Sequence, residues 1–98
     1  MARFCVHRLP DGVYVLDCQT DLLDHLTTRF VVPLVPLDDV GTPMARLNPQ
    51  FNVDGHRLVM MTQFSGAVPA RSLGKVVLSL RDQDYEISKA LDMLIAGF

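Results

Sequence analysis

The chain has 98 residues, of which 49% are hydrophobic and 20% charged, and its formal net charge is −2 at pH 7. This length predicts a single domain over residues 1–98, and the small negative charge without a Lys/Arg-rich run excludes a nucleic-acid binder that works through a basic patch. No apolar run approaches the ~18 residues of a membrane helix, and the N-terminus lacks a signal-peptide core, so we expect a cytoplasmic protein that does not contact a membrane.

The first two predicted strands, residues 3–8 and 13–18, form a hairpin around a Leu-Pro-Asp-Gly turn. In that turn proline presets φ, and glycine tolerates positive φ. Cys5 and Cys18 fall within the strands, where small buried thiols are common. No CxxC or Cys/His spacing supports a zinc site, so we expect two reduced thiols, no metal and no other cofactor.

The connection after this hairpin carries an apolar pair, Leu22 and Leu23, between Asp21 and Asp24. Core residues normally lie on strands, and loops are normally polar. An apolar pair flanked by charges therefore predicts a surface that contacts a partner. The two carboxylates are expected to bond backbone groups of the connection, and Arg29 to pair with one of them and hold the loop in place.

The next predicted strand, residues 29–36, is a near-continuous apolar run interrupted by Pro33 and Pro36. Each proline removes a ladder donor, which predicts an edge strand or a bend. A second hairpin is expected around Asp54 and Gly55, a strong turn signal. The remaining predicted strands cover residues 48–53, 56–62, 67–69 and 73–80. Many short strands separated by Gly and Pro turns indicate a sandwich or a small barrel.

From about residue 81 the apolar period changes from roughly 2 to roughly 3.6, which predicts a C-terminal α-helix capped by Ser79 or Asp82. One helical stripe, which we expect to pack on the sheet, contains Ile87, Leu91, Leu94, Ile95 and Phe98. The face away from it contains Tyr85, Ser88, Asp92, Met93 and Ala96. Tyr85 and Met93 make this face more apolar than solvent requires, so we expect an interface there.

Several blocks, in the right order, resemble the CcdB family, the toxin half of a bacterial toxin–antitoxin pair. They are DCQTDLLD at residues 17–24, RFVVPL at 29–34, MMT at 60–62 and AVP at 67–69. The family reads DVQSD followed by two aliphatic residues and Asp, then Arg-x-Val-Ile-Pro-Leu, MMT and SVP. The resemblance covers essentially the whole chain. It implies a mainly β, SH3-like barrel, with an antiparallel main sheet, a small second sheet and a C-terminal α-helix.

The resemblance also implies a function. Family members are protein inhibitors, not enzymes: they bind the A subunit of DNA gyrase, trap the cleaved DNA–gyrase complex and so inhibit growth in plasmid maintenance. The implied gyrase-binding residues are Leu22, Leu23, Asp84, Tyr85, Ser88, Asp92, Ala96, Gly97 and Phe98. A small CcdA-like antitoxin with a disordered C-terminal half would bind Leu22, Leu23, Asp24, Ser88 and Asp92. A homodimer would use Met93 and Leu94. No direct contact with nucleic acid is implied.

The chain departs from the family at its end. The family ends Trp-Gly-Ile, and its Trp stacks on an arginine of gyrase, whereas this chain has Ala96, Gly97 and Phe98. Asp92 also stands where the family has an Asn. One alternative is therefore a decayed toxin that keeps only antitoxin and dimer contacts.

A second alternative is an endoribonuclease toxin of the Kid/MazF type, which shares the fold and uses acid–base residues and an arginine. Its candidate residues would be Asp24, His25 and Arg29, or His7 and His56.

Overall fold

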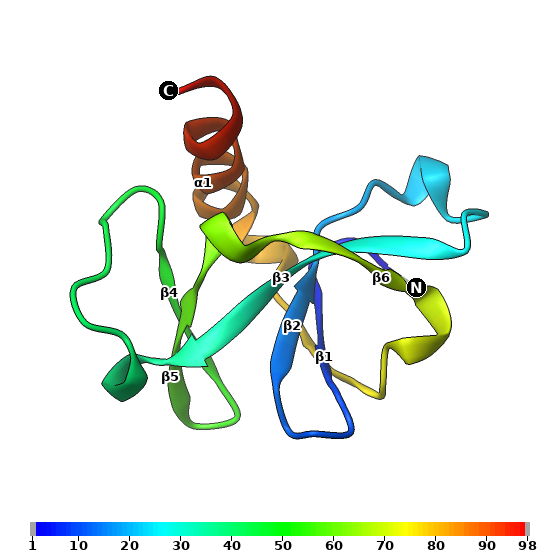
Figure 1. Cartoon of the computed structure of the whole chain (residues 1–98), viewed down its shortest axis with the longest axis horizontal. Helices are drawn as coiled ribbons and strands as arrows, with labels where there is room; N and C mark the ends of the chain where they lie inside the picture. Colours follow the sequence, from blue (N-terminus) through cyan, green and yellow to red (C-terminus); the bar gives the residue numbers. More distant parts are fainter. Residues whose placement is uncertain (1, 98) are drawn as a thin grey trace.

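A computed structural model describes residues 2–97, which fold into a mainly β structure with one C-terminal α-helix (Figure 1). The elements are β1 (Cys5–Arg8), β2 (Tyr14–Asp17), β3 (Thr28–Pro36), β4 (Gln50–Val53), β5 (His56–Met60), β6 (Gly66–Pro69), β7 (Val76–Ser79) and α1 (Asp84–Ala96). Short 3-10 turns cover Asp21–Leu23, Leu37–Asp39, Thr62–Phe64, Ala70–Ser72 and Arg81–Gln83. No helix within the described range is long and apolar enough to cross a membrane.

All strand pairings are antiparallel, in the order β4-β5-β3-β2-β1-β7, and β6 pairs with the first half of β3. The sheet curls on itself, as the figure shows, and the predicted SH3-like barrel with a C-terminal helix is confirmed (Figure 1). β4 and β7 form its two ends, because within residues 2–97 each pairs with one neighbour only.

Of the two alternatives that the prolines predicted, an edge strand or a bend, the edge is excluded, because β3 pairs with β2 on one side and with β6 and β5 on the other. On that second side, pairing with β6 ends at Val31 and pairing with β5 begins at Leu34. The carbonyl of Pro33 accepts a hydrogen bond from the Met61 N–H on this side. The missing N–H of Pro33 therefore falls in the gap between two partners, where no ladder donor is needed.

Two turns depend on particular residues. Asp54 and Gly55 both have positive φ, 52° and 80°, as the two-residue turn between β4 and β5 requires. This confirms the hairpin expected there. At Gly74 the chain passes so close to β1 that a Cβ would collide with the Arg8 carbonyl oxygen, so only glycine fits.

The core lies between the curled sheet and the first half of α1. Ile87 and Ala90 are fully buried and Leu91 packs against the same cluster. Beyond them the helix projects away from the sheet (Figure 1). Leu94 is 38% exposed and Ile95 is 79% exposed, so the prediction that the whole stripe packs on the sheet is wrong for its second half. Its last member, Phe98, lies outside the described residues.

Candidate functional site

The apolar pair of the first connection lies on the surface. It falls in the 3-10 turn Asp21–Leu23, which follows β2. Thr20 begins this turn, and its side-chain oxygen accepts a hydrogen bond from the Leu22 N–H at 3.3 Å. Leu22 is 87% exposed and Leu23 is 42% exposed. Residues 19–24 are called the anchored loop below, because the contacts of its other residues hold it on the barrel.

Arg29 is the centre of these contacts and is fully buried. Its Nε lies 2.8 Å from the Asp17 carboxylate, and its Nη1 lies 3.0 Å from that of Asp24. Its Nη2 also donates to the Gln19 carbonyl at 3.4 Å. The predicted pairing of Arg29 with either Asp21 or Asp24 is confirmed, and Asp24 is the partner. The fully buried partner, Asp17, was missed because only the register of β2 against β3 places it on the face that Arg29 shares.

Gln19 ties the loop to the neighbouring strand. Its side-chain oxygen accepts a hydrogen bond from the Phe30 N–H at 3.0 Å, and its side-chain nitrogen donates to the Leu23 carbonyl at 2.9 Å. Its own backbone N–H donates to the Asp17 carboxylate at 3.1 Å. One side chain thus joins the turn that presents the apolar pair to β3.

Asp21 connects the anchored loop to two other parts of the chain. One carboxylate oxygen accepts a hydrogen bond from the Arg3 N–H at 2.9 Å, and the other lies 3.5 Å from the Arg81 guanidinium, just before α1. The expectation that Asp21 bonds groups of its own connection is therefore wrong. Thr20 caps that connection, and Asp21 links it to the N-terminal segment and to the base of the helix.

The outer residues of α1 form one row. The helix follows the 3-10 turn Arg81–Gln83, whose first N–H donates to the Ser79 hydroxyl at 3.2 Å. The expected capping of the helix by Ser79 or Asp82 is wrong, because the helix begins later, after Gln83, which makes no side-chain cap. The Ser88 hydroxyl donates to the Asp84 carboxylate at 2.9 Å. The Lys89 ammonium lies 5.6 Å from the centre of the Tyr85 ring, which stays 69% exposed. At about 100° per residue, Tyr85, Ser88, Asp92 and Ala96 share this face.

The helix ends in a left-handed cap. Gly97 has φ 84°, and its N–H donates to the carbonyls of Asp92 and Met93 at 3.1 and 3.2 Å. A glycine adopts this conformation without steric cost, which explains why the chain has one here. Met93 is half-buried, and Leu94, Ala96 and Gly97 are exposed. Residues 93–97 are called the helix end below.

The predicted contact residues therefore form two patches within one chain. The ion pair between Asp21 and Arg81 brings the anchored loop near the base of α1. The helix end lies about 18 Å along the axis from that base, at about 1.5 Å per residue, and Figure 1 places it on a different part of the molecule from the Asp21–Leu23 turn. A partner that binds both patches of one chain has to span them.

The residues considered for RNA cleavage are not arranged for it. Arg29 is fully buried and held by two carboxylates, so it cannot reach a phosphate. His7 is 1% exposed, with Nδ1 2.9 Å from the Gly74 carbonyl, so it is not accessible to an RNA substrate. His25 and His56 are exposed. Within residues 2–97 no cluster of His, Cys, Asp and Glu could hold a metal ion.

Neither cysteine offers a nucleophile. Both are free and buried, as expected for reduced thiols. Burial raises the pKa of the Cys18 thiol to about 12, the nearby Asp17 carboxylate adds to this rise, and Arg3 lowers it. Because only a thiolate attacks or binds a metal, Cys18 is inert at neutral pH.

A comparison with models of known protein families identifies the family of this chain. The family model described as CcdB protein matches residues 3–97. This range includes the anchored loop, all of α1 and its glycine cap. No curated protein matches the chain significantly.

Proposed function

Because the chain belongs to the CcdB family, whose members are toxins of toxin–antitoxin modules rather than catalytic enzymes, we propose that it binds the A subunit of DNA gyrase and traps the cleaved DNA–gyrase complex. The toxin class follows from the family. The gyrase target, the contact residues, the homodimer and the cytoplasmic location belong to the proposal.

The exposure of Leu22 is the observation that carries this proposal. A leucine that is 87% exposed gains about 1.5–3 kcal/mol when a partner buries it. The anchored loop is held by the buried Arg29, which pairs with Asp24 and donates to the Gln19 carbonyl. A partner that docks on Leu22 and Leu23 therefore has little conformational entropy to remove, which favours binding.

The second contact is the outer row of α1, with Asp84, Tyr85, Ser88, Asp92 and Ala96, followed by Gly97 and Phe98. Tyr85 supplies a large exposed aromatic surface close to the base of the helix. At the other end, Ala96 offers no ring to stack on an arginine, and such a contact is worth about 0.5–2 kcal/mol. We therefore expect weaker poisoning than a member with Trp at this position shows, and Ala96→Trp to strengthen gyrase binding by roughly threefold to thirtyfold.

The antitoxin and the dimer complete the proposal. A small antitoxin with a disordered segment would cover Leu22, Leu23, Asp24, Ser88 and Asp92. These residues overlap the proposed gyrase contact, so the two partners would exclude each other. The homodimer would use Met93 and Leu94 at the helix end, which brings the helix ends of two chains together and offers gyrase a larger surface.

A calorimetric titration with the purified A subunit of gyrase tests the proposal. Leu22→Ser should weaken binding at least tenfold, because it removes most of the apolar area of the exposed contact. Val76→Ser is the matched control, since Val76 is a 48% exposed apolar residue on β7, outside the proposed contact. Equal weakening by both variants, or no binding by the folded wild type, would contradict the proposal, and the latter result would favour a decayed toxin.

A further inference from the structure

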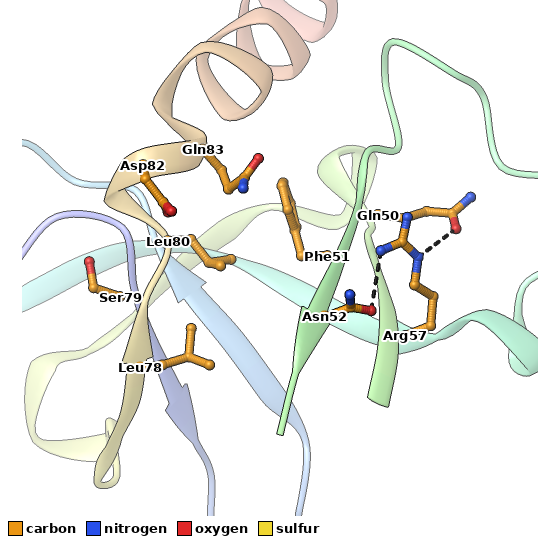
Figure 2. A pocket seen from close by; sticks show the side chains of 9 residues that line it. All are labelled: Gln50, Phe51, Asn52, Arg57, Leu78, Ser79, Leu80, Asp82 and Gln83. Carbon is orange, nitrogen blue, oxygen red and sulfur yellow. Dashed lines mark hydrogen bonds between the residues drawn. The ribbon is translucent and has the colours of Figure 1, made fainter. Parts of the chain in front are cut away.

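The two end strands of the curled sheet, β4 and β7, face each other across an open hollow of about 470 Å³ (Figure 2). Its lining includes Phe51 from β4 and Leu78 and Leu80 from the opposite wall; Phe51 and Leu80 are largely buried, and Leu78 is half-buried. A second hollow of about 510 Å³ continues along β4 towards Pro43 and shares four of its lining residues: Gln50, Phe51, Arg57 and Gln83. Together they form a groove, called the β4 groove, that follows the whole outer edge of β4.

The backbone of β4 presents unpaired hydrogen-bonding groups to this groove. The Pro49 carbonyl accepts a hydrogen bond from the Met60 N–H. In an antiparallel ladder every second residue bonds the neighbouring strand, so the residues of β4 that bond β5 are Phe51 and Val53. The backbone groups of successive residues point to opposite sides of a strand, so the N–H and C=O of Gln50 and Asn52 point away from β5. No backbone partner of these two residues is found within the described part of the chain. An exposed strand edge of this kind pairs readily with another extended chain.

The side chains beside this edge carry a positive charge that is already positioned. Arg57 reaches across β4, where its Nε donates to the Gln50 side chain at 3.3 Å and its Nη1 to the Asn52 side chain at 3.2 Å (Figure 2). Both partners are neutral, and residues 2–97 place no carboxylate within ion-pair distance of this guanidinium. Asp82 and Glu86 also line the groove, so the guanidinium is the site for an acidic side chain only on the side of Asn52. Its remaining N–H groups are free to bind an anion in a fixed orientation.

We propose that an extended peptide segment of a partner protein adds as a strand to the free edge of β4, with an acidic side chain beside Asn52 and Arg57. Alternate side chains of an added strand point to opposite faces of the sheet. Those on the inner face lie over the half-buried Leu78 and over the edges of the largely buried Phe51 and Leu80. Those on the outer face lie beside Asn52, where the guanidinium of Arg57 selects Asp or Glu. Backbone pairing supplies affinity, and the alternating pattern supplies specificity.

Amide hydrogen exchange of the full chain with the blocked peptide Thr-Val-Glu-Val-Thr at millimolar concentration tests this pairing. The amides of Gln50 and Asn52 should exchange at least tenfold more slowly with the peptide, whereas those of Phe51 and Val53, which already bond β5, should change little. Replacing the Glu of the peptide by Lys, or Arg57→Met in the protein, should weaken binding about threefold or more, because each removes the charge pair.

Asn52→Pro and Asn52→Thr form a matched pair of variants. Both lose the side-chain contact with Arg57, but only proline also removes the N–H that faces the groove, without touching the ladder to β5. Binding should persist in Asn52→Thr and disappear in Asn52→Pro. A peptide with methylated backbone nitrogens gives the same test on the wild type and should not bind.

Three results would overturn the proposal: unchanged exchange of both amides in the presence of the peptide, equal binding by the two Asn52 variants, or binding by the methylated peptide. Slower exchange of both amides at high protein concentration without peptide would also overturn it, because a second copy would then occupy the edge. None of these measurements involves gyrase, so their outcome is independent of the proposed toxin target.

Discussion

Leu22 and Ile95 are exposed to almost the same extent, 87% and 79%, but the molecule holds them in different ways. Leu22 sits on the anchored loop, which is fixed by side-chain contacts to β2, β3, the N-terminal segment and the base of α1. Ile95 sits on the helix end, which is held by the helix backbone and by its glycine cap. The buried anchor of that helix, Ile87, lies two turns earlier.

The difference shows how a small barrel can present apolar side chains that it does not bury. The conformation of the anchored loop depends on Arg29, which pairs with Asp24 of the loop and with the buried Asp17 of β2. The presentation of Leu22 and the stability of the fold are therefore coupled. At the helix end the conformation is local, so the surface can change without a large effect on the fold. A rigid loop and a locally held helix also differ in the entropy that a partner has to remove.

The largest expected effect comes from Arg29→Met. The variant leaves the Asp17 carboxylate buried without its partner, and breaking a buried ion pair in this way costs about 3–5 kcal/mol. Urea unfolding measures the loss, with Arg81→Met as a control, because that arginine is 65% exposed in its pair with Asp21. A loss of less than about 1 kcal/mol would show that the anchored loop is not coupled to the fold.

The matching change for the helix is Ile87→Ala, which removes the buried anchor of α1. We expect a loss of about 2–4 kcal/mol, because a fully buried isoleucine leaves a cavity when it is truncated. Amide exchange should increase along α1 and stay slow in the anchored loop. Equal increases in both regions would mean that they unfold as one unit and would remove the distinction between them.

The Cys18 thiol, directly before the anchored loop, should make the free energy of unfolding depend on pH. Its pKa is raised from 9.0 to about 12, so above pH 9 the unfolded chain loses this proton while the native state keeps it. Native stability should therefore be insensitive to this group below pH 9 and fall by about 1.4 kcal/mol per pH unit between the two pKa values. Unfolding of Cys18→Ala measured over the same range should lack this decrease. An identical decrease in the variant would assign it to other groups.

The smallest expected effects on stability are those of Leu22→Ser and Ile95→Ser. Both side chains are in solvent in the single chain, so each change should alter the free energy of unfolding of the monomer by no more than about 0.5 kcal/mol. Thermal melting of both variants measures this. A clear loss in one variant would show that its side chain packs on a second chain in solution, as a homodimer through the helix end predicts for the neighbourhood of Ile95.

Local chemistry predicted the elements well. Asp54 and Gly55 set the second hairpin, and the change of apolar period located the helix. The helix and the proline strand were incompletely predicted for the same reason: a local sequence pattern does not show how far the neighbouring strands extend. The period of α1 gives the direction of its apolar face but not where the sheet below it ends, so Ile95 was expected in the core. For Pro33 the sequence predicted an edge or a bend and could not decide between them, because the gap between its two strand partners depends on pairings far along the chain.

The same reasoning applies to the candidate site. The exposed pair Leu22 and Leu23 was predicted, because it stands out against the polar residues of a connection. A pairing of Arg29 with Asp21 or Asp24 was also predicted. The buried partner Asp17 was not, because only the register of two strands places it there. The free edge of β4 is likewise invisible in sequence, since it depends on which strands remain unpaired at the ends of the sheet.

A DNA-cleavage assay with gyrase, ATP and plasmid tests the central claim most directly. The full chain is compared with a variant truncated after Ile95, which lacks Ala96, Gly97 and Phe98, and with Val76→Ser as a folded control. Linear DNA should accumulate with the full chain and with the control, and disappear with the truncated variant. No linear DNA with the folded full chain, or undiminished cleavage by the truncated variant, would contradict a gyrase poison that acts through the end of this chain.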